Sequence, residues 1–292
     1  MNKTYENEIT VILTAYKRVD SLSRQLESIR KQTIKPKEVW LFQDKIPKDY
    51  NITIDQTLLE QFDKIYIADE NVGVWGRFNF AREVRTEYVC IFDDDTIPGQ
   101  QWLENCYSQM QKQEGIYGTI GVIFTNPSNY TKDGHFRIGW HRPNEETKEV
   151  DLVGHSWFLK TKWLEFMFEL APKYSTKYKY AAEDMCLSYG CLLNGIHTYV
   201  PPHPIENMRF WGSQPQTALS LGVTSVALSL GNNNVVMNAA AAELVNDGWE
   251  ILLKRNPQYV QTGWKKEKRY RWKARRKNVV RKISKILKKR KD

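Results

Sequence analysis

Short apolar runs alternate with segments of helical periodicity along the first hundred residues of the chain. Four of these runs predict buried strands, at residues 9–13, 38–42, 64–68 and 88–92. Between the first two, Leu22, Leu26 and Ile29 recur at the spacing of one helical face. Strands separated by helices are typical of parallel sheets with crossover connections, so the pattern predicts an α/β fold with a mostly parallel central sheet.

The second half of the chain continues this pattern less regularly. It predicts strands at 118–124, 150–159 and 197–200, and helices at 102–111, 162–170 and 183–193. Residues 209–235 have no firm periodicity and are rich in Gly, Asn and Ser, which favours a flap. An Ala- and Leu-rich segment, 236–254, predicts one more helix before the C-terminal tail.

Three of the first four predicted strands end in acidic residues. Asp44 follows the second strand, Asp69 and Glu70 precede Asn71 after the third, and the run 93–95 follows the fourth. Ligands of open parallel sheets bind at the carboxyl ends of the strands. These positions therefore predict a nucleotide cleft.

The run Asp93-Asp94-Asp95 would repel itself strongly at the end of a buried strand. A hard divalent cation, Mn²⁺ or Mg²⁺, favours carboxylate oxygens and shares its shell with substrate phosphates. In an extended segment Asp93 and Asp95 face one side and Asp94 faces the other. We expect Asp95 and Asp93 to bind metal, with Asp93 nearer the nucleoside and Asp94 nearer the donor sugar. The alternative is a helix cap or a solvated turn.

Five short motifs occur in a characteristic order. They are Thr14-Ala15-Tyr16-Lys17-Arg18, Asp44, Asn71-Val72-Gly73 with Arg77, Phe92-Asp93-Asp94-Asp95-Thr96, and Glu183-Asp184. Together they resemble family 2 glycosyltransferases of the GT-A fold over about residues 8–205. The resemblance implies a GT-A fold with a Rossmann-like nucleotide-binding half, a UDP-sugar donor and a Mn²⁺ or Mg²⁺ cofactor.

The resemblance also implies residues that hold the nucleotide sugar. The nucleobase and ribose would contact Thr14, Ala15, Tyr16, Arg18 and Asp44. A carboxylate can accept the N3 proton of uracil, and an aromatic ring can stack on the base. Asn71 and Arg77 flank a turn and a helix start, a setting that suits a diphosphate. A solvated loop remains the alternative for Tyr16 and Arg18, and a surface arginine for Arg77.

The pair Glu183-Asp184 opens a predicted helix, where acidic residues are favourable for the helix dipole alone. By resemblance, Asp184 is the general base that deprotonates the acceptor, and Glu183 helps to bind the acceptor. The expected reaction is a single displacement with inversion. The triplet followed by Thr also looks like retaining exostosin-type transferases, so retention stays open, as does a nucleotidyltransferase or a non-catalytic binding module.

Three further residues are candidates for the acceptor side and the metal. His155 and Trp157, after a predicted strand, lie where family members line the acceptor pocket, although a core tryptophan is an equal alternative. His203, within a Pro-rich turn, is expected to complete the metal shell from the C-terminal side; the alternative is a structural histidine.

The charge of the chain is unevenly distributed. Residues 265–292 hold 16 of the 43 Lys and Arg residues but only 2 of the 34 Asp and Glu residues, so the remaining body is net acidic. Apolar positions from Val279 to Leu287 fall on one face of a predicted basic amphipathic helix. We expect this tail to bind an anionic membrane, with a solvated tail as the alternative, and consider nucleic acid an improbable partner because the body is acidic.

These features predict three segments: a catalytic domain at 1–205, a flap and packed helix at 206–260, and the basic tail at 261–292. The catalytic domain would divide into a nucleotide-sugar half, about 8–100, and an acceptor half, about 101–205. Scattered cysteines, a polar start and the lack of a long apolar run favour a cytoplasmic protein, peripheral on the inner face of the cytoplasmic membrane. The expected role is sugar transfer to a glycan or lipid-linked acceptor in surface polysaccharide synthesis.

Overall fold

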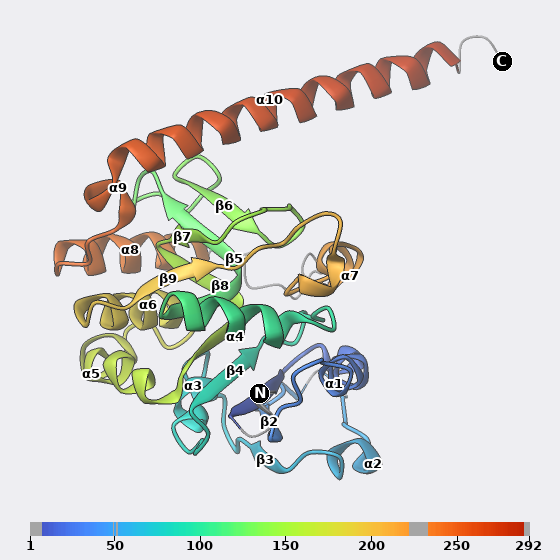
Figure 1. Cartoon of the computed structure of the whole chain (residues 1–292), viewed down its shortest axis with the longest axis vertical. Coiled ribbons are helices and arrows are strands. Elements are labelled where there is room, and N and C mark those ends of the chain that lie inside the picture. Colours follow the sequence, from blue (N-terminus) through green and yellow to red (C-terminus); the bar gives the residue numbers. More distant parts are fainter. Residues whose placement is uncertain (1–7, 49, 51, 222–232, 289–292) are drawn as a thin grey trace.

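A nine-stranded mixed sheet forms the centre of the computed structural model (Figure 1). The structure describes residues 8–48, 50, 52–221 and 233–288, without the side chains of 218, 219, 233, 275 and 277–288. The strands are β1 Ile9–Ala15, β2 Glu38–Gln43, β3 Lys64–Ile67, β4 Tyr88–Phe92, β5 Gly115–Phe124, β6 His135–Gly139, β7 Lys148–Val150, β8 Leu152–Lys160 and β9 His197–Val200. The sequence located all of these except β6 and β7.

The sheet order is β3-β2-β1-β4-β8-β5-β9-β7, with β6 paired to β5. The four strands of the N-terminal half are parallel to one another, as predicted. The long strand β8 then enters antiparallel between β4 and β5. Because β4 and β8 run in opposite directions, the residues that follow Phe92 meet the middle of β8, where Phe92 pairs with Ser156.

Helices surround the sheet (Figure 1). They are α1 Leu22–Arg30, α2 Gln56–Leu59, α3 Gly76–Ala81, α4 Trp102–Lys112, α5 Leu164–Tyr174, α6 Glu183–Leu193, α7 Pro215–Leu221, α8 Asn233–Asn246, α9 Leu252–Arg255 and α10 Pro257–Lys288. In α1 the predicted apolar positions Leu22, Leu26 and Ile29 are buried. One continuous apolar core joins the strands to these helices. An α/β fold is thereby confirmed.

The helix predicted at 236–254 is interrupted, which corrects that prediction. Helix α8 ends at Asn246, and Gly248 adopts a left-handed backbone conformation with φ of 110°. The amide of Trp249 bonds to the carbonyl of Leu244 at 2.9 Å, which is the hydrogen bonding of a glycine C-cap. The flap expected at 209–235 contains helix α7, and its residues 222–232 lie outside the described residues.

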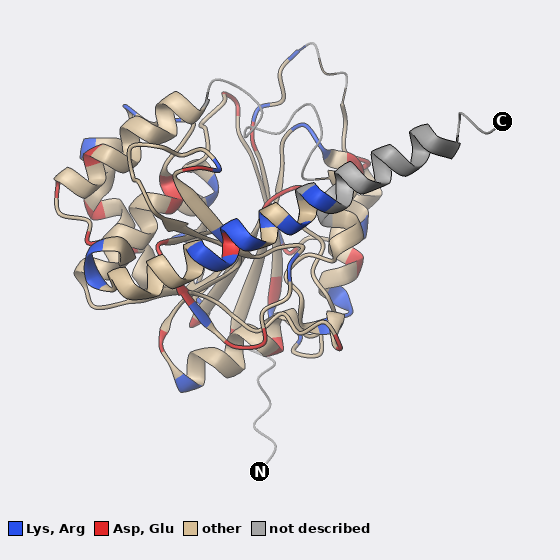
Figure 2. Ribbon diagram, turned by 90° about the horizontal axis from the view of Figure 1, so that it is seen from above, with Lys and Arg blue, Asp and Glu red and all other residues tan. Residues whose placement is uncertain are grey.

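Helix α10 extends far beyond the body, at an expected length of about 48 Å (Figures 1 and 2). Its first turns pack on the body: Val260 is buried, and the ring of Trp264 lies 6.2 Å from that of Phe136. The apolar positions predicted to face a membrane lie among side chains that the structure does not describe. Within the described residues, no helix combines the length and apolar character that a membrane span requires.

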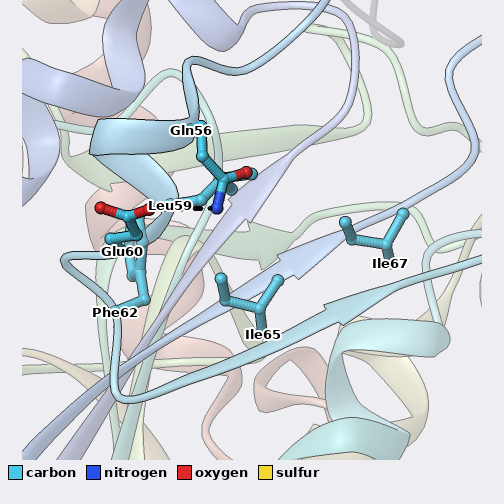
Figure 3. A pocket seen from close by; sticks show the side chains of 6 residues that line it. All are labelled: Gln56, Leu59, Glu60, Phe62, Ile65 and Ile67. Atoms are coloured by element: carbon cyan, nitrogen blue, oxygen red, sulfur yellow. Dashed lines mark hydrogen bonds between the residues drawn. The ribbon is translucent and has the colours of Figure 1, made fainter.

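A shallow hollow of about 520 Å³ lies at the sheet edge, beside strand β3 (Figure 3). Its lining residues are Gln56, Leu59, Glu60, Phe62, Ile65 and Ile67. None of the residues predicted to bind a ligand lines this hollow. The predicted site instead gathers at the carboxyl ends of β1 and β4.

Candidate active site

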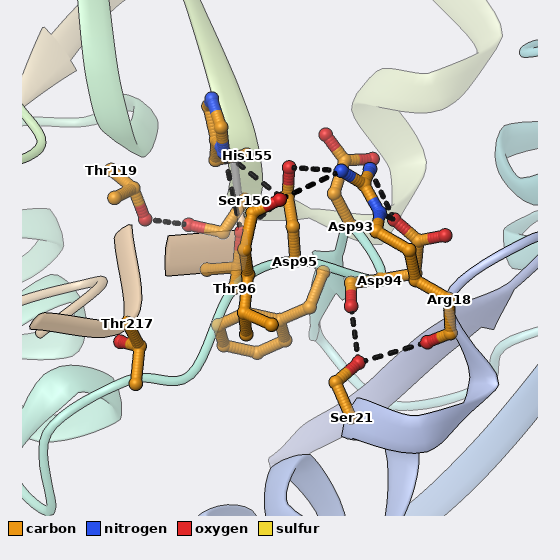
Figure 4. A network of polar contacts seen from close by, with 12 residues as sticks. Arg18, Ser21, Asp93, Asp94, Asp95, Thr96, Thr119, His155, Ser156 and Thr217 are labelled. Carbon is orange, nitrogen blue, oxygen red and sulfur yellow. Dashed lines mark hydrogen bonds and ion pairs between the residues drawn. The ribbon is translucent and has the colours of Figure 1, made fainter. Parts of the chain in front are cut away.

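The acidic run follows β4 directly and lies against β8 (Figure 4). The amide of Asp93 donates to the carbonyl of His155 at 3.0 Å, which extends the β4–β8 pairing by one residue. The amide of Thr96 in turn bonds to the carbonyl of Asp93 at 3.2 Å, so the run turns sharply. This antiparallel pairing brings His155 next to carboxylates sixty residues earlier in the chain.

Arg18 lies across two members of the run (Figure 4). Its Nε donates to Asp94 Oδ1 at 2.9 Å, and its Nη1 lies 3.2 Å from Asp95 Oδ2. The same Nη1 donates to the carbonyl of Leu221 at 3.1 Å, which ties α7 to the site. Arg18 therefore supplies part of the positive charge that the sequence led us to expect beside the triplet.

Asp95 also contacts two other side chains, His155 and Thr96. Its Oδ1 lies 3.1 Å from His155 Nδ1 and accepts from Thr96 Oγ1 at 3.2 Å. Asp93, Asp95 and His155 each offer a ligand atom, and these atoms lie within 4.8 Å of one another. Two carboxylates and one imidazole are a donor set that Mn²⁺ accepts well, so the residues present fit a divalent cation.

The ionisable side chains of this group shift one another's pKa values. Burial raises the pKa of Asp94 to about 6, although Arg18 opposes the shift. For Asp95, burial acts in the same direction but is outweighed by His155 and Arg18, which hold its pKa below the usual value. Burial disfavours charge on His155 as well, but Asp95 outweighs it and raises the pKa of the imidazole. Asp95 and His155 thus favour one another's charged forms.

His203 is fully buried and has a structural role, which corrects its prediction as a metal ligand. Its Nδ1 bonds to the carbonyl of Pro201 at 2.8 Å, and its Nε2 accepts from the amide of Gly212 at 3.3 Å. With both ring nitrogens bonded within the protein, neither is available to a cation. His155, which the sequence assigned to the acceptor, is the histidine that lies beside Asp93 and Asp95.

Three residues near the site have left-handed backbone conformations that side chains other than glycine rarely adopt. They are Trp140, His155 and Ala182, with φ values of 63°, 66° and 64°. His155 belongs to the candidate cation site, the ring of Trp140 lies 5.7 Å from that of His155, and Ala182 precedes Glu183. Backbone strain of this kind is concentrated at functional sites.

The predicted nucleotide residues meet at the ends of β1 and β2. The amide of Asp44 donates to the carbonyl of Ala15 at 3.1 Å, and Tyr16 Oη accepts from Asn71 Nδ2 at 3.0 Å. Asp44 Oδ1 in turn accepts from the amide of Val72 at 3.0 Å. Thr14 donates from Oγ1 to the carbonyl of Phe92 at 2.8 Å and so joins β1 to β4.

Arg77 joins the acidic run to the second carboxylate pair. Its Nη2 lies 3.4 Å from Asp93 Oδ1 and 2.7 Å from Glu183 Oε1. Its guanidinium carbon lies 4.8 Å from the ring centre of Trp157. Burial disfavours this charge, yet the carboxylates outweigh burial and raise the pKa of Arg77. The arginine is therefore a partly exposed, charged link between the two acidic groups, with 13% of its side chain exposed.

Trp157 is a core residue. Its side chain is 2 % exposed, its ring lies 5.2 Å from that of Phe78, and its Nε1 donates to the carbonyl of Val153 at 2.8 Å. A ring so enclosed has no face free for a sugar, which corrects that part of the prediction. Trp157 contacts the guanidinium of Arg77 instead.

Glu183 and Asp184 open helix α6 in a buried environment. Burial raises the pKa of Glu183, and Arg77 partly offsets the shift. The pKa of Asp184 is raised well above its ordinary value, first by burial and then by repulsion from Glu183. A carboxylate whose environment disfavours its negative charge is a stronger proton acceptor than an ordinary aspartate.

The sequence did not identify Trp140, because it is a single residue outside any motif and follows a strand that the sequence did not predict. Only the pairing of β6 with β5 brings its ring beside His155.

The match to a known protein family agrees with this architecture. The family model described as glycosyl transferase family 2 matches residues 10–168 of the chain. No curated protein matches the chain. Among solved structures, the chain is similar to the S. aureus protein TarS 1-349 in complex with UDP, at 18% sequence identity and a TM-score of 0.44. That similarity covers 66% of this chain and 60% of the TarS chain, so the chain spans less than two thirds of that structure.

The family match covers more than half of the chain and includes the parallel half of the sheet, the acidic run and β8. The chain therefore belongs to glycosyl transferase family 2 and has the α/β architecture of the GT-A fold.

Proposed function

We propose that this glycosyltransferase moves one sugar from a UDP-sugar to an acceptor hydroxyl and inverts the anomeric centre. The observation that carries the proposal is the position of Arg77, whose Nη2 contacts both Asp93 and Glu183. One side chain thus connects the candidate cation site to the carboxylate pair. The donor phosphates and the acceptor hydroxyl would lie on either side of this arginine.

The donor would lie at the ends of β1 and β2. Tyr16 offers a ring for the base, and Asp44 offers a carboxylate, whose Oδ1 accepts the amides of Lys45 and Val72. Asp93, Asp95 and His155 would hold a Mn²⁺ or Mg²⁺ ion, which would stabilise negative charge on the departing diphosphate. Asp94, paired with Arg18, would face the donor sugar.

On the acceptor side, Asp184 would take the proton of the attacking hydroxyl. Its raised pKa suits a general base that works near neutral pH. Glu183 would remain charged through its ion pair with Arg77 and would orient the acceptor. A base on the side opposite the leaving group is the arrangement that inversion requires.

The proposal is tested by donor binding and turnover with purified protein. We expect UDP to raise the melting temperature only when Mn²⁺ or Mg²⁺ is present, because a ligand of the native state stabilises that state. Release of UDP from UDP-glucose, UDP-galactose or an N-acetylhexosamine donor should follow. The anomer of the product, read by NMR, decides between inversion and retention. Absence of both binding and UDP release across these donors would refute the proposal.

We also propose that the enzyme is peripheral on an anionic membrane and that its acceptor is a lipid-linked or surface glycan. The described part of α10 presents Tyr270 and Trp272, which are exposed, among basic side chains (Figure 2). Aromatic rings interleaved with lysine and arginine suit the headgroup layer of an anionic bilayer. The full chain should sediment with phosphatidylglycerol vesicles and not with phosphatidylcholine vesicles. Equal sedimentation with both, or with neither, would contradict this role of α10.

A further inference from the structure

Arg18 contacts a carboxylate that the proposed function assigns to a divalent cation (Figure 4). Its Nη2 lies 2.6 Å from Asp94 Oδ1, and its Nη1 lies 3.2 Å from Asp95 Oδ2. The three side chains are 19%, 12% and 7% exposed, in the order Arg18, Asp94 and Asp95. Burial disfavours the charge of Arg18, but the two carboxylates outweigh burial and raise its pKa. A positive charge is therefore already bound to the acidic run.

Both carboxylate oxygens of Asp95 have partners within the protein. Oδ1 lies 3.1 Å from His155 Nδ1 and accepts from Thr96 Oγ1 at 3.2 Å, whereas Oδ2 contacts Arg18. A divalent cation binds a carboxylate through these same oxygens. Arg18 carries a permanent positive charge, and like charges repel strongly where water is largely excluded. A cation on Asp95 therefore competes with the Nη1 contact of Arg18.

The same nitrogen of Arg18 also holds the end of helix α7. Nη1 donates to the carbonyl of Leu221, the last residue of α7, at 3.1 Å. Just before the start of α7, the amide of Gln214 bonds to the carbonyl of Ile97 at 3.2 Å. Helix α7 is thus attached at one end to the chain that follows the acidic run and at the other end to Arg18. Because one nitrogen serves both Asp95 and Leu221, a change at Asp95 reaches α7.

The contacts between Arg18 and Asp94 do not involve this nitrogen. Nε donates to Asp94 Oδ1 at 2.9 Å, and Nη2 contacts the same oxygen. The hydroxyl of Ser21 bonds to the carbonyl of Asp94 and lies 3.0 Å from the carbonyl of Arg18, so the two backbones are also joined. Arg18 can therefore lose its contact with Asp95 and remain paired with Asp94.

We infer that Arg18 is a positioning residue which a divalent cation displaces from Asp95, and that this displacement frees the end of α7. Without the cation, Nη1 neutralises Asp95 and holds Leu221. When the cation binds, Arg18 keeps its pair with Asp94 and gives up Asp95. The inference rests on the proposed function, because it gives Arg18 a role at that same cation site.

The first test is the affinity of the nucleotide-free full chain for Mn²⁺, measured by calorimetry. Arg18→Gln removes the charge that competes for Asp95, so Mn²⁺ should bind about tenfold tighter or more. Arg18→Lys keeps a positive charge and should bind Mn²⁺ less tightly than Arg18→Gln does. An arginine that only held the carboxylates in place would give the opposite sign. Equal or weaker Mn²⁺ binding by Arg18→Gln would therefore overturn the inference.

Arg24→Gln is the matched control. Arg24 is exposed on α1, so this variant removes the same charge from a surface position a few residues along the chain. Its affinity for Mn²⁺ should change by less than about twofold, because exposed charges are screened by solvent and salt. Equal tightening in Arg24→Gln and Arg18→Gln would reflect the net charge of the chain and would overturn the inference.

Thermal unfolding gives a second measurement of the same competition. Without cation, Arg18→Gln should melt at a lower temperature than the unmodified chain, because Asp94 loses its partner. Saturating Mn²⁺ should then raise the melting temperature more in Arg18→Gln than in the unmodified chain, since tighter binding to the native state stabilises it more. A smaller rise in Arg18→Gln would contradict the competition.

Hydrogen exchange tests the link to α7 in the unmodified chain, so this result does not depend on the folding of a variant. Mn²⁺ alone should speed exchange of the backbone amides of α7, because the carbonyl of Leu221 loses the donor that holds it. Exchange in α4, which Arg18 does not contact through any of these bonds, should stay the same. Unchanged exchange of α7 at saturating Mn²⁺ would overturn the inference.

These outcomes separate the inference from the proposed function. If the unmodified chain binds neither Mn²⁺ nor UDP in the presence of Mn²⁺, the proposed function fails. If it binds both and Arg18→Gln does not bind Mn²⁺ more tightly, only the role of Arg18 fails.

Discussion

The proposed donor half and the proposed acceptor half of the site differ in how their polar groups are satisfied. In the donor half, Asp44 accepts from the amide of Val72, and Asn71 Oδ1 accepts from the amide of Gly73 at 2.9 Å. In the acceptor half, Asp184 has a raised pKa, Trp140 Nε1 is unpaired and Ala182 is left-handed. The nucleotide end of the donor half is thus hydrogen-bonded within the protein, whereas unfavourable features occur in the acceptor half and at the cation site, where burial raises the pKa of Asp94 and His155 is left-handed.

This difference indicates how the two halves contribute: one binds the donor, and the other prepares the proton transfer. A preorganised donor site binds its ligand without rearrangement. The carboxylate of Asp184, whose negative charge is disfavoured by burial and by Glu183, is ready to take a proton. Arg77 belongs to both halves, and it is the residue through which a change on one side reaches the other.

The largest expected effect concerns the acceptor half alone. Asp184→Asn removes the proposed base, so kcat for sugar transfer should fall by about 10²–10⁴-fold. Binding of UDP with Mn²⁺, measured by thermal shift, should weaken far less, because Asp184 is not expected to touch the donor. Unchanged transfer by this variant would show that the base lies elsewhere.

The next effect tests the link between the halves. Arg77→Ala leaves the buried carboxylate of Glu183 without its cation, so the free energy of unfolding should fall by about 3–5 kcal/mol. Arg82→Ala is a matched control, since Arg82 pairs with Glu165 at the surface and its loss should cost at most about 1 kcal/mol. Chemical denaturation measures both. A similar loss in the two variants would mean that Arg77 is not a structural link.

The third effect concerns the donor half. Asp95→Asn should weaken Mn²⁺-dependent UDP binding by about 100-fold, because a carboxylate ligand is replaced by a weaker neutral one. Chelation with EDTA should have a similar consequence for the unmodified chain, measured by calorimetry. His203→Gln should leave the metal dependence of UDP binding intact. If His203→Gln alone lost the metal dependence of UDP binding, His203 would be the metal ligand after all.

The effect per unit change is smallest for a pH dependence in the scaffold of the acceptor half. Burial raises the pKa of Asp151 to about 7, although its carboxylate accepts the amides of Phe124 and Leu252. The folded state therefore holds this proton more tightly than the unfolded state does. From about pH 4 to pH 7, the unfolding free energy should fall relative to Asp151→Asn, by about 1.4 kcal/mol per pH unit. Parallel pH profiles of the two proteins would contradict the buried, protonated state.

Local patterns predicted most of the parallel half. Strands β1, β2 and β4 consist mainly of apolar residues, and Asp44 and the acidic run follow β2 and β4 directly. Strand β6 was missed because it alternates polar with apolar residues, and β7 because it has only three residues; their pairing with β5 and β9 defines them. The broken helix at 236–254 was missed because Gly248 acts through its backbone conformation, not through the apolar pattern.

The aspartate run and the Glu183-Asp184 pair were predictable because neighbouring carboxylates at strand and helix ends are visible in a sequence. The choice between His155 and His203 was not, because a histidine binds metal only if its nitrogens are free and near other ligands. The antiparallel pairing of β8 with β4 places His155 beside Asp95, and burial with two hydrogen bonds occupies His203. Residue type and order specify which chemistry is available, and long-range packing decides which of those groups meet, because distance and burial depend on the whole fold.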